Sequence, residues 1–546
     1  MLKELVRERL REALKELDLR GVEPEVSPPD REEYGDLSSN VALTLKCGPP
    51  QEVASKIIAH LDQGPFSRVE VAGAGFINFF LRPEEIRKVL QAILERGERY
   101  GLSDLGRGKR VQVEYGSANP TGPLHIGFGR NVVLGDTIAN LLEALGYEVE
   151  REYYVNDAGT QVELFAQSLY WYYAQALGRE PPLDFPEGGY RGEYLQEWAR
   201  ELAAAEPDIL RLPLEEGLQK IKRLGVERVL KDVCEDLKML GIHYDRWFYE
   251  HDLYDGDEDE APFTKVMAIL KENGYLEERE GAVWFKATEL GAEKDEVLIR
   301  SDGRPGYFAS DVAYHYNKFV ERGLDWVIDV WGADHQGHVP RMLAMMKALG
   351  LDPDRLTLLI YQLVTIKRGG EEVRLSKRSG ELITLRELID EVGPDAVRYF
   401  LLSRSPDTHL EFDLALAKEQ SKENPVFYIQ YAHTRIAGIF RELGDRIDDW
   451  EGIDLGPLEA REELELIKKL DEFPEVVKDA ARSFAPHLLA NYAYSLAALF
   501  HLFYDRYRVL GEAEEVSLSR LALCRGVQLV LRRSLELMGV SAPERM

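Results

Sequence analysis

The sequence predicts a multidomain protein whose centre is an α/β Rossmann-like domain with a parallel sheet. A small α+β domain is expected before it and an all-α domain after it. The chain has 546 residues, enough for about three or four domains of ordinary size. Strand and helix patterns alternate from residue 111 onward, as in parallel α/β sheets. From about residue 407 the apolar spacing is helical to the end of the chain.

The first 105 residues are predicted to form the small α+β domain. Helices are expected at Leu2–Leu17, 50–61 and 83–96, and strands at Val69–Val71 and Phe76–Phe80. The first helix is amphipathic and charges interrupt its apolar pairs, which is typical of a helix docked on a neighbour and not of a signal peptide. A glycine-rich, charged segment after Tyr100 is expected to lead into the next domain.

Residues 106–406 are predicted to form the α/β domain. Alternating apolar residues from Val111 to Tyr115 predict a strand, the segment Asn119–Pro123 breaks it, and helical spacing runs from Asn131 to Leu145. A strand, a turn and a helix in this order present backbone N–H groups and a helix N-terminus to a phosphate. The second strand is expected at Glu148–Val155.

Residues from about 158 to 290 interrupt the alternation and are predicted to form a mostly helical insertion in the middle of the sheet. The α/β pattern is expected to resume after it, with strands at Val297–Arg300, Trp326–Val330 and Leu356–Thr365 and helices at Ser310–Val320 and Val339–Leu349. Residues 407–546 are predicted to form the third domain, helical throughout.

Composition limits the classes of function. The net charge of −29 opposes nonspecific binding to nucleic acid, so a nucleic-acid partner must be met by local basic faces. Cys47, Cys234 and Cys524 form no CxxC pair, which argues against a disulfide framework or a structural zinc and favours a reducing cytoplasm. No run of about 18 apolar residues is present, so no membrane-spanning helix is expected.

A histidine in the glycine-rich turn is the first candidate for chemistry. The segment Pro123-Leu124-His125-Ile126-Gly127, with Gly129 after it, allows a nucleotide to approach the backbone closely, and His125 can reach the same phosphate. In the alternative interpretation, which has about equal weight, His125 only caps the helix.

A cationic segment, Lys367–Gly380, is the second candidate. Gly369 and Gly370 predict a hairpin tip, and Ser376-Lys377-Arg378 follow it in a loop. A solvated charge cluster is the usual explanation of such a run. Beside a phosphate-binding turn, a mobile cationic loop can instead close on a triphosphate and stabilise the charge that develops on its phosphates.

Two further groups follow predicted strands. Polar residues of the segment Trp331–His338 are expected to contact a ligand at the end of a parallel strand. The His-x-x-His pair of this segment has a low weight as a metal site, because no third ligand has a characteristic spacing.

Glu114, Glu250 and Asp311, with Tyr307 one helical turn before Asp311, are ordinary surface acids unless they converge on a cation. Guanidinium is the cation best matched by planar, bidentate carboxylates with an aromatic neighbour.

Several stretches together resemble one known family. His125-Ile126-Gly127-Phe128 is similar to the HIGH motif, and Arg374-Leu375-Ser376-Lys377-Arg378 to the KMSKS-type loop, of class I aminoacyl-tRNA synthetases. The stretches at 114–125, 307–311, 332–335, 395–398 and 539–546 resemble the bacterial type of arginyl-tRNA synthetase; other class I enzymes share only the two short motifs. The resemblance covers essentially the whole chain.

Three residues depart from the family's motifs. Phe128 stands where the HIGH motif has its second histidine. Arg374 stands where the loop has its first lysine and keeps the charge, and Leu375 stands for its methionine and keeps the apolar bulk. The loop's main lysine is retained as Lys377, so activity is expected, with His125 and Lys377 carrying more of the phosphate binding.

The resemblance implies a class I catalytic domain that ligates L-arginine to tRNA(Arg). In the first step the arginine carboxylate attacks the α-phosphate of ATP, which enters with Mg2+, and pyrophosphate leaves. This activation of arginine is expected to depend on bound tRNA. In the second step the arginyl group passes to the 2′-hydroxyl of the terminal adenosine of the tRNA. The implied residues are, for catalysis, His125, Arg374, Ser376, Lys377 and Arg378; for ATP, Pro123, Leu124, Ile126, Gly127, Phe128, Gly129, Gly332, Asp334 and His335; and for arginine, Glu114, Ser117, Asn119, Glu250, Tyr307 and Asp311.

The outer domains resemble the tRNA-contacting parts of the family. In the helical C-terminal domain, which resembles an anticodon-binding domain, Tyr428, Tyr431 and Met546 are the candidates to stack on unpaired bases. The N-terminal domain resembles one that touches the corner of the tRNA, and a monomer without editing domain or membrane partner is expected. Two alternatives stay open: a tRNA-binding protein that has lost catalysis, which Phe128 favours, and a class I synthetase for another amino acid.

Overall fold

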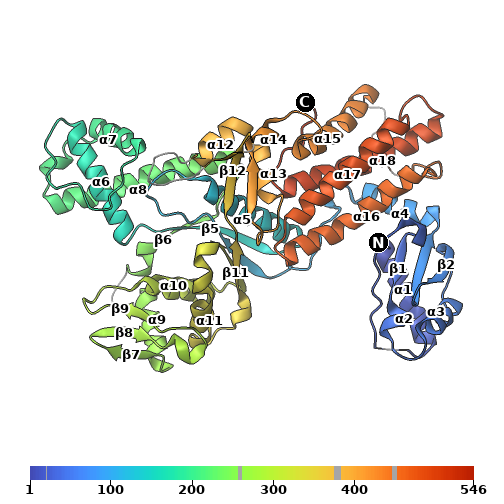
Figure 1. Cartoon of the computed structure of the whole chain (residues 1–546), viewed down its shortest axis with the longest axis horizontal. Helices are drawn as coiled ribbons and strands as arrows, with labels where there is room; N and C mark the ends of the chain where they lie inside the picture. The colour runs from blue at the N-terminus through green and yellow to red at the C-terminus, as the bar shows by residue number, and fades with distance from the viewer. Residues whose placement is uncertain (20, 256–260, 370, 374–382, 445–449, 451) are drawn as a thin grey trace.

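A five-stranded parallel sheet forms the centre of the molecule (Figure 1). Its order is β11-β10-β4-β5-β6, and all neighbouring strands are parallel. The strands are β4 (Arg110–Glu114), β5 (Glu148–Val155), β6 (Arg246–Tyr249), β10 (Trp326–Gly332) and β11 (Leu356–Tyr361). The chain winds first to one side of β4 and then to the other, which is the doubly wound order of a Rossmann-like fold. The predicted parallel α/β sheet is therefore confirmed.

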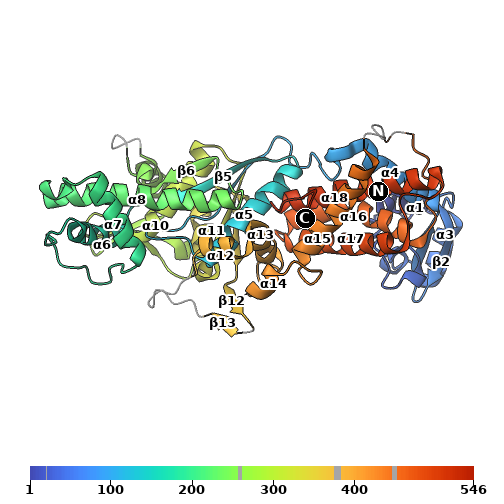
Figure 2. The same cartoon turned by 90° about the horizontal axis from the view of Figure 1, so that it is seen from above.

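The computed structural model describes residues 1–19, 21–255, 261–369, 371–373, 383–444, 450 and 452–546. In this part of the chain, no helix is both long and apolar enough to cross a membrane. The molecule is elongated, as Figures 1 and 2 show. The N-terminal residues lie at one end beside the C-terminal helices, and α6 (Thr160–Ala176) and α7 (Glu193–Ala205) lie at the other.

Helix α5 (Ile126–Ala144) follows β4 and lies inside the molecule. The sheet covers one side of it, and α13 (Pro394–Leu402) and α16 (Arg461–Arg482) pack on it as well, so most of its residues are buried. A helix covered on several sides needs apolar residues all round. The helix begins directly after His125, five residues before the predicted Asn131, because Gly127, Gly129 and the buried Arg130 hide its start in the sequence.

The segment predicted as one helical insertion, 158–290, contains a strand of the central sheet. Helices α6, α7 and α8 (Leu214–Met239) precede β6, and the small antiparallel sheet β7 (Leu276–Arg279), β8 (Ala282–Phe285) and β9 (Glu296–Ile299) follows it. The prediction that the parallel sheet resumes at Val297 is wrong, because β9 pairs with β8. Strands of about four residues are too short for their periodicity to reveal which sheet they join.

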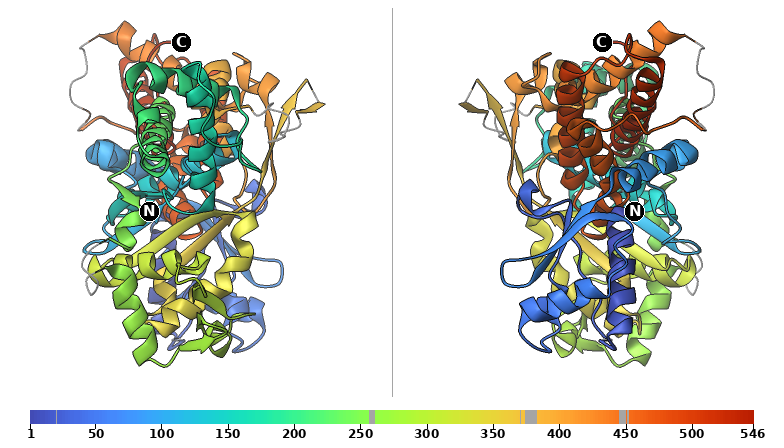
Figure 3. Two further views of the ribbon diagram at one scale, coloured as in Figure 1. Left: turned by 90° about the vertical axis from the view of Figure 1, so that its left-hand side faces the viewer. Right: turned by 90° about the vertical axis from the view of Figure 1, so that its right-hand side faces the viewer.

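The predicted strand Leu356–Thr365 is two strands in two sheets. β11 ends at Tyr361, and β12 (Val364–Arg368) belongs to a second sheet of order β13-β12-β14. β14 (Leu410–Asp413) lies in the region predicted to be helical throughout and pairs with β12 in parallel. The hairpin of β12 and β13 (Glu371–Val373) projects from the body of the molecule (Figures 2 and 3).

The N-terminal residues form a three-stranded antiparallel sheet of order β1-β3-β2, packed with helices. The elements are α1 (Leu2–Glu16), β1 (Leu37–Ser39), α3 (Pro50–Ala59), β2 (Phe66–Ala72), β3 (Phe76–Leu81) and α4 (Pro83–Arg96), of which only β1 was not predicted. The unit is fixed to α16: Leu2 N–H donates to Asp471 at 2.9 Å, Tyr100 O–H to the Leu470 carbonyl at 3.0 Å, and Lys468 pairs with Asp36 at 2.7 Å.

Four long helices make up the C-terminal part: α15 (Pro425–Leu443), α16, α17 (His487–Arg506) and α18 (Glu514–Leu537). One buried side chain, Arg398 of α13, joins them to the rest. It donates to the carbonyls of Met538 at 2.7 Å and Leu240 at 2.9 Å, and it pairs with Asp136 of α5. Gly539 has φ +67°, and a Cβ there would lie 2.1 Å from the Arg398 guanidinium carbon, so only glycine fits.

Candidate active site

The carboxyl ends of β4 and β10 border the crevice where ligands bind in a doubly wound sheet. β4 ends at Glu114 and β10 at Gly332, and the strand order reverses between them. Asn131 of α5 holds the two edges together. Its Oδ1 accepts from the N–H of Gly116 at 2.5 Å, and its Nδ2 donates to the carbonyl of Val330 at 2.8 Å.

His125 occupies the N-cap of α5 at one wall of this crevice. Its Nδ1 accepts from the N–H of Gly127 at 3.1 Å, so the histidine caps the helix, as one of the two interpretations predicted. A Cβ on residue 127 would lie 2.9 Å from the imidazole, which is why glycine is needed there. The ring of Phe128 packs against the imidazole with 4.7 Å between centroids, so Phe128 supports the cap as an apolar neighbour.

The described residues that follow the predicted cationic loop lie next to this cap. Arg374, Ser376, Lys377 and Arg378 lie outside the described residues. Before them, β12 and β13 pair across Gly369, whose φ of +62° confirms a hairpin tip. After them, Thr384 forms a β-bridge with His125, and the N–H of Leu385 donates to the Leu124 carbonyl at 2.8 Å. The loop is therefore anchored on the histidine turn.

The other predicted ATP-binding residues divide into buried and accessible ones. Leu124 and Ile126 are buried in the core and serve packing with their side chains. A Cβ on Gly129 would lie 3.0 Å from Leu385, so the glycine allows close packing at that point. Pro123 is exposed.

At the opposite edge, Gly332 ends β10, and Asp334 and His335 follow it with side chains 78% and 50% exposed. The His335 ring lies against Trp331, 5.8 Å between centroids. Their polar groups are thus available to a ligand in the crevice.

Two carboxylates, Glu250 and Asp311, meet beyond the end of the sheet. Glu250 lies at the start of the turn after β6, and Asp311 lies on α10 (Tyr307–Tyr316). The hydroxyl of Ser310 donates to Glu250 at 2.5 Å and contacts the Tyr254 hydroxyl at 2.8 Å. No ion pair involves either carboxylate in the described part of the chain, and Asp311 has no side-chain hydrogen bond there. Among the residues with described positions, the pair is therefore a negative site that no ion pair neutralises.

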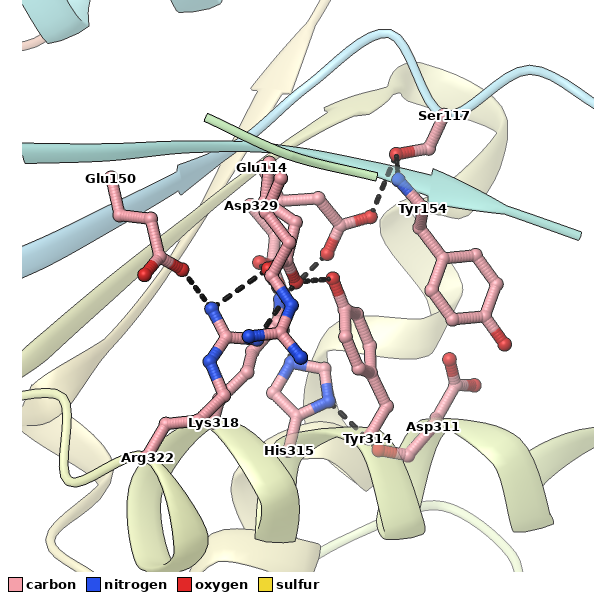
Figure 4. A network of polar contacts seen from close by, with 12 residues as sticks. Glu114, Ser117, Glu150, Tyr154, Asp311, Tyr314, His315, Lys318, Arg322 and Asp329 are labelled. Carbon is pink, nitrogen blue, oxygen red and sulfur yellow. Dashed lines mark hydrogen bonds and ion pairs between the residues drawn. The ribbon is translucent and has the colours of Figure 1, made fainter. Parts of the chain in front are cut away.

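Burial raises the pKa of both carboxyl groups. For Glu250 the charge of Asp311 adds to this effect, while the Ser310 hydrogen bond opposes it. For Asp311, His315 and Arg341 only partly offset the desolvation. Burial, with the charges of Glu250 and Asp311, also raises the pKa of Tyr154, which lies between the two sides of the site (Figure 4). A bound cation would relieve the cost of keeping both carboxylates ionised.

Glu114, by contrast, already has a cationic partner. Its Oε2 accepts from Nζ of Lys318 at 2.6 Å, and its Oε1 accepts from the Ser117 hydroxyl at 2.9 Å. Lys318 also donates to Asp329 of β10 at 2.9 Å, and His315 contacts the same carboxylate at 2.8 Å (Figure 4). Burial raises the pKa of Glu114, and the Lys318 charge works against this rise.

Asn119 and Tyr307 lie at the rim of the site. Asn119 is exposed and donates to Gln161 of α6 at 2.7 Å. Tyr307 is 82% exposed, and the Arg300 guanidinium lies 5.1 Å from its ring centroid. The structure therefore brings Glu250 and Asp311 together, whereas Tyr307 lies one turn away on α10 and forms no hydrogen bond with them in the described residues.

Lys318 and Asp329 are site residues that the sequence analysis missed. Asp329 stands in an otherwise apolar strand between Ile328 and Val330, and an acid in such a strand signals a buried partner. Lys318 lies seven residues after Asp311, on the same helical face, which is a weaker indication. The segment Asn317–Glu321 is a π-helix, which sequence spacing does not reveal.

The candidate base-stacking residues lie on α15 and at the end of the chain. Tyr431 is 38% and Met546 is 54% exposed. Tyr428 is partly buried beside His501, 4.4 Å between ring centroids. The carbonyl of Pro543 accepts hydrogen bonds from α15 at 2.9 and 3.0 Å, which brings the last residues alongside this helix.

Among the described residues, no group of three or more His, Cys, Asp or Glu side chains is arranged to hold a metal ion. The low weight given to a His335-x-x-His338 metal site stays a prediction. The two rings lie edge to face, 5.2 Å apart, and burial lowers the pKa of His338.

Comparisons with known proteins cover the whole molecule. Three family models match: "Arginyl tRNA synthetase N terminal domain" at residues 2–81, "tRNA synthetases class I (R), catalytic domain" at 89–402, and "DALR anticodon binding domain" at 429–546.

The chain is also similar to curated proteins over its full length. A protein of Caldanaerobacter subterraneus subsp. tengcongensis is 48% identical, with 100% of this chain and 98% of that protein covered. A protein of Thermotoga maritima is 45% identical, with 100% of both chains covered. Both bear the name Arginine–tRNA ligase.

Among solved structures, the chain is similar to Thermus thermophilus arginyl-tRNA synthetase, with a TM-score of 0.77, 25% identity and 100% of both chains covered. The arginyl-tRNA synthetase of Plasmodium falciparum has the same fold, with a TM-score of 0.74 at 19% identity, covering 100% of this chain and 99% of that one.

Proposed function

The chain belongs to the arginyl-tRNA synthetase family, and from this premise we propose which residues carry out its reaction. The protein is an arginine–tRNA ligase, which uses ATP to join arginine to tRNA. The assignment of roles to individual side chains, the course of the reaction and the state of the protein in the cell are the proposal.

Glu250 and Asp311 bind the guanidinium group of arginine. The observation that carries this assignment is that two neighbouring carboxylates, whose pKa values burial has raised, form no ion pair with any residue that the structure describes. A planar guanidinium can satisfy both through several N–H groups, and the exposed ring of Tyr307 offers an aromatic face nearby. Lysine has a compact ammonium group and leaves part of this site unpaired, which discriminates against it.

Glu114, Ser117 and Asn119 bind the other end of the amino acid. Glu114 accepts from the α-ammonium group, and Ser117 holds its carboxylate in place through the 2.9 Å hydrogen bond. Asn119, exposed at the rim, donates to the arginine carboxylate. The distance from Glu114 to the pair of Glu250 and Asp311 then has to match the length of the substrate.

ATP lies across the crevice with its phosphates at the N-terminus of α5. Backbone N–H groups after His125, beside Gly127 and Phe128, face the phosphates, and the helix dipole favours negative charge there. Gly332, Asp334 and His335 line the adenosine. The loop with Arg374, Ser376, Lys377 and Arg378 closes over the triphosphate; its anchorage at Thr384 beside His125 supports this.

The first step is an in-line displacement at the α-phosphate. A carboxylate oxygen of arginine forms a bond to phosphorus, the bond to the bridging oxygen of pyrophosphate breaks, and no proton needs to move, because the attacking carboxylate is already ionised. Lys377 and the arginines of its loop stabilise the charge on the α-phosphate and on the leaving pyrophosphate. Mg2+ enters with ATP and neutralises phosphate charge; the donors around it are mainly phosphate and water oxygens.

In the second step the 2′-hydroxyl of the terminal adenosine of tRNA(Arg) attacks the arginyl carbonyl. The ester bond forms, AMP leaves, and the hydroxyl proton departs with the phosphate or solvent. Tyr428, Tyr431 and Met546 stack on anticodon bases at the far side of the molecule. The enzyme acts as a monomer in the cytoplasm; its exposed Cys47 and Cys234 suit a reducing compartment.

Charging of tRNA(Arg) with arginine tests the proposal. The wild-type chain is expected to form arginyl-tRNA, and Glu250→Gln and Asp311→Asn to lose kcat/KM for arginine without losing affinity for ATP. If these variants lost as much affinity for ATP as for arginine, the pocket assignment would be wrong. A wild-type chain without pyrophosphate exchange in the presence of tRNA, together with restored exchange in Phe128→His, would instead support the tRNA-binding protein that lacks activity. Light scattering of the full chain measures the oligomeric state.

A further inference from the structure

Three buried charges lie in line under the amino-acid end of the pocket (Figure 4). Glu114 contacts Lys318 at 2.6 Å, and Lys318 contacts Asp329 at 2.9 Å. The side chains of Lys318 and Asp329 are 0% exposed, whereas that of Glu114 is 11% exposed. Only Glu114 therefore reaches the crevice, and the other two charges act on a ligand through it.

We propose that Lys318 and Asp329 are a positioning pair for the α-ammonium group of arginine: Lys318 fixes the direction of the Glu114 carboxylate, and Asp329 cancels the Lys318 charge so that the three groups together keep one net negative charge toward the substrate. This inference rests on the proposed role of Glu114. It adds two residues that do not touch the substrate themselves.

The charge balance shows why both residues are needed. Glu114, Lys318 and Asp329 together carry one net negative charge, which an incoming ammonium group neutralises. Without Asp329, Glu114 and Lys318 would neutralise each other, and the incoming ammonium group would bring an uncompensated positive charge near Lys318 in a buried environment where like charges repel strongly. Without Lys318, two carboxylates would share a buried site, one would take up a proton, and Glu114 would lose the contact that orients it.

The backbone around Lys318 is built to bring its ammonium group to this point. The helix widens into a π-helix at Asn317–Glu321, a distortion that is rare and often marks functional sites. The Lys318 ammonium lies 4.1 Å from the ring centroid of Tyr314, which adds a favourable cation–π contact. His315, one of the groups that face Asp329, contacts it at 2.8 Å, and its Nδ1 donates to the Asp311 carbonyl at 2.8 Å. The pair is thus joined to α10, the helix that carries Asp311.

Two inhibitors separate the ends of the substrate. Agmatine keeps the guanidinium and an ammonium group but lacks the carboxylate, and 5-guanidinopentanoic acid lacks only the α-amino group. Both are used as competitors of arginine in tRNA charging by the full-length enzyme. Asp329→Asn is expected to raise KM for arginine and Ki for agmatine by roughly 10- to 100-fold, the loss typical of a disrupted buried charge pair, and to leave Ki for 5-guanidinopentanoic acid within about threefold.

The double variant Lys318→Met/Asp329→Asn provides the decisive comparison. Glu114 then carries the single negative charge alone, still held by Ser117, so the affinity for agmatine is expected to recover most of what Asp329→Asn loses. A purely structural role predicts additive or larger losses and no difference between the inhibitors. Lys265→Met is the control, because it removes an exposed ion pair with Glu321 on the same π-helix and should change none of the constants.

Glu114→Gln distinguishes failure of this inference from failure of the pocket assignment. If Glu114→Gln leaves the affinity for agmatine unchanged, Glu114 does not bind the ammonium group and the proposed role itself is wrong. If Glu114→Gln weakens agmatine selectively but Asp329→Asn affects both inhibitors equally, or the double variant shows no recovery, the positioning pair is refuted while the pocket assignment stands.

Discussion

The two acidic parts of the amino-acid pocket are built in opposite ways. Glu250 and Asp311 lie together without a cation in the described residues, and burial raises the pKa of both. Glu114 is more deeply buried than either, but it contacts Lys318, which in turn contacts Asp329. The first part gains a cationic partner only when a ligand brings one, whereas the second holds its own ion pairs in the free protein and keeps one net negative charge. The difference indicates that the carboxylates of Glu250 and Asp311 lower the stability of the free protein and are kept because they bind the substrate.

The largest expected effect is a loss of catalysis when the pair of Glu250 and Asp311 is changed. Asp311→Asn should lower kcat/KM for arginine by about 100- to 10,000-fold, because the guanidinium loses one of two charged partners in a desolvated site. Steady-state charging of tRNA with varied arginine measures this, and KM for ATP serves as the internal control. A loss below about threefold would show that Asp311 does not contact the guanidinium.

The next largest effect is a loss of stability when Lys318, the cation between Glu114 and Asp329, is replaced. Lys318→Met should destabilise the catalytic domain by about 3–5 kcal/mol, because it leaves Glu114 and Asp329 buried without their shared counter-ion. Urea unfolding followed by tryptophan fluorescence measures the loss. Lys318→Met/Asp329→Asn should regain part of it, since fewer buried charges then lack partners; no regain would mean that Lys318 acts through its packing alone.

A third prediction follows from the raised pKa values of Glu250 and Asp311. A carboxyl group with a raised pKa takes up its proton at a higher pH than usual, and a neutral carboxyl pairs poorly with guanidinium. The KM for arginine should therefore rise as pH falls, beginning above the range in which ordinary carboxyl groups titrate, by up to about tenfold per pH unit for each of the two groups that takes up a proton. The KM for ATP, measured in the same buffers, separates this effect from general inactivation. A flat KM for arginine between pH 8 and 5 would contradict it.

The smallest effect is a gain in stability. Because the folded pKa of Asp311 lies above its unfolded value, the folded state binds the proton more tightly, and ionised Asp311 costs stability at every pH above the folded pKa. Asp311→Asn should therefore raise the melting temperature of the free enzyme at pH 7.5 by about 1–3 °C. The gain should shrink as pH falls through the raised folded pKa of Asp311 and disappear below the unfolded value of about 3.9; a gain that persists there would have another cause.

The general organisation could be predicted from the sequence because long periodic elements and motifs report it directly. The strands at 111–115, 148–155 and 326–330 and the helix at 83–96 appear where their apolar spacing put them. The short strands β6, β9 and β14 could not be assigned to their sheets, since pairing partners depend on the fold and four residues carry little pattern.

For the site, sequence stretches identified Glu250 and Asp311, and the fold brings them together. The role of Lys318 could not be predicted, because its position depends on a π-helix and on contacts with strands far away in the sequence. His125 was open to two interpretations, and only its hydrogen bond with Gly127 identifies the cap. The residues of the cationic loop lie outside the described chain, so their roles stay predictions.

The buried Arg398 also has a consequence for the order in which the molecule is assembled during synthesis. One of its acceptors, the carbonyl of Met538, is made 140 residues after it. At about 5–20 residues per second, the ribosome needs roughly 7–30 s to cover that distance. During this interval the guanidinium has Asp136 and the Leu240 carbonyl as partners, but the C-terminal helices cannot complete their docking. The strands of the central sheet are thus synthesised before the last contact that fixes the domain proposed to select the tRNA.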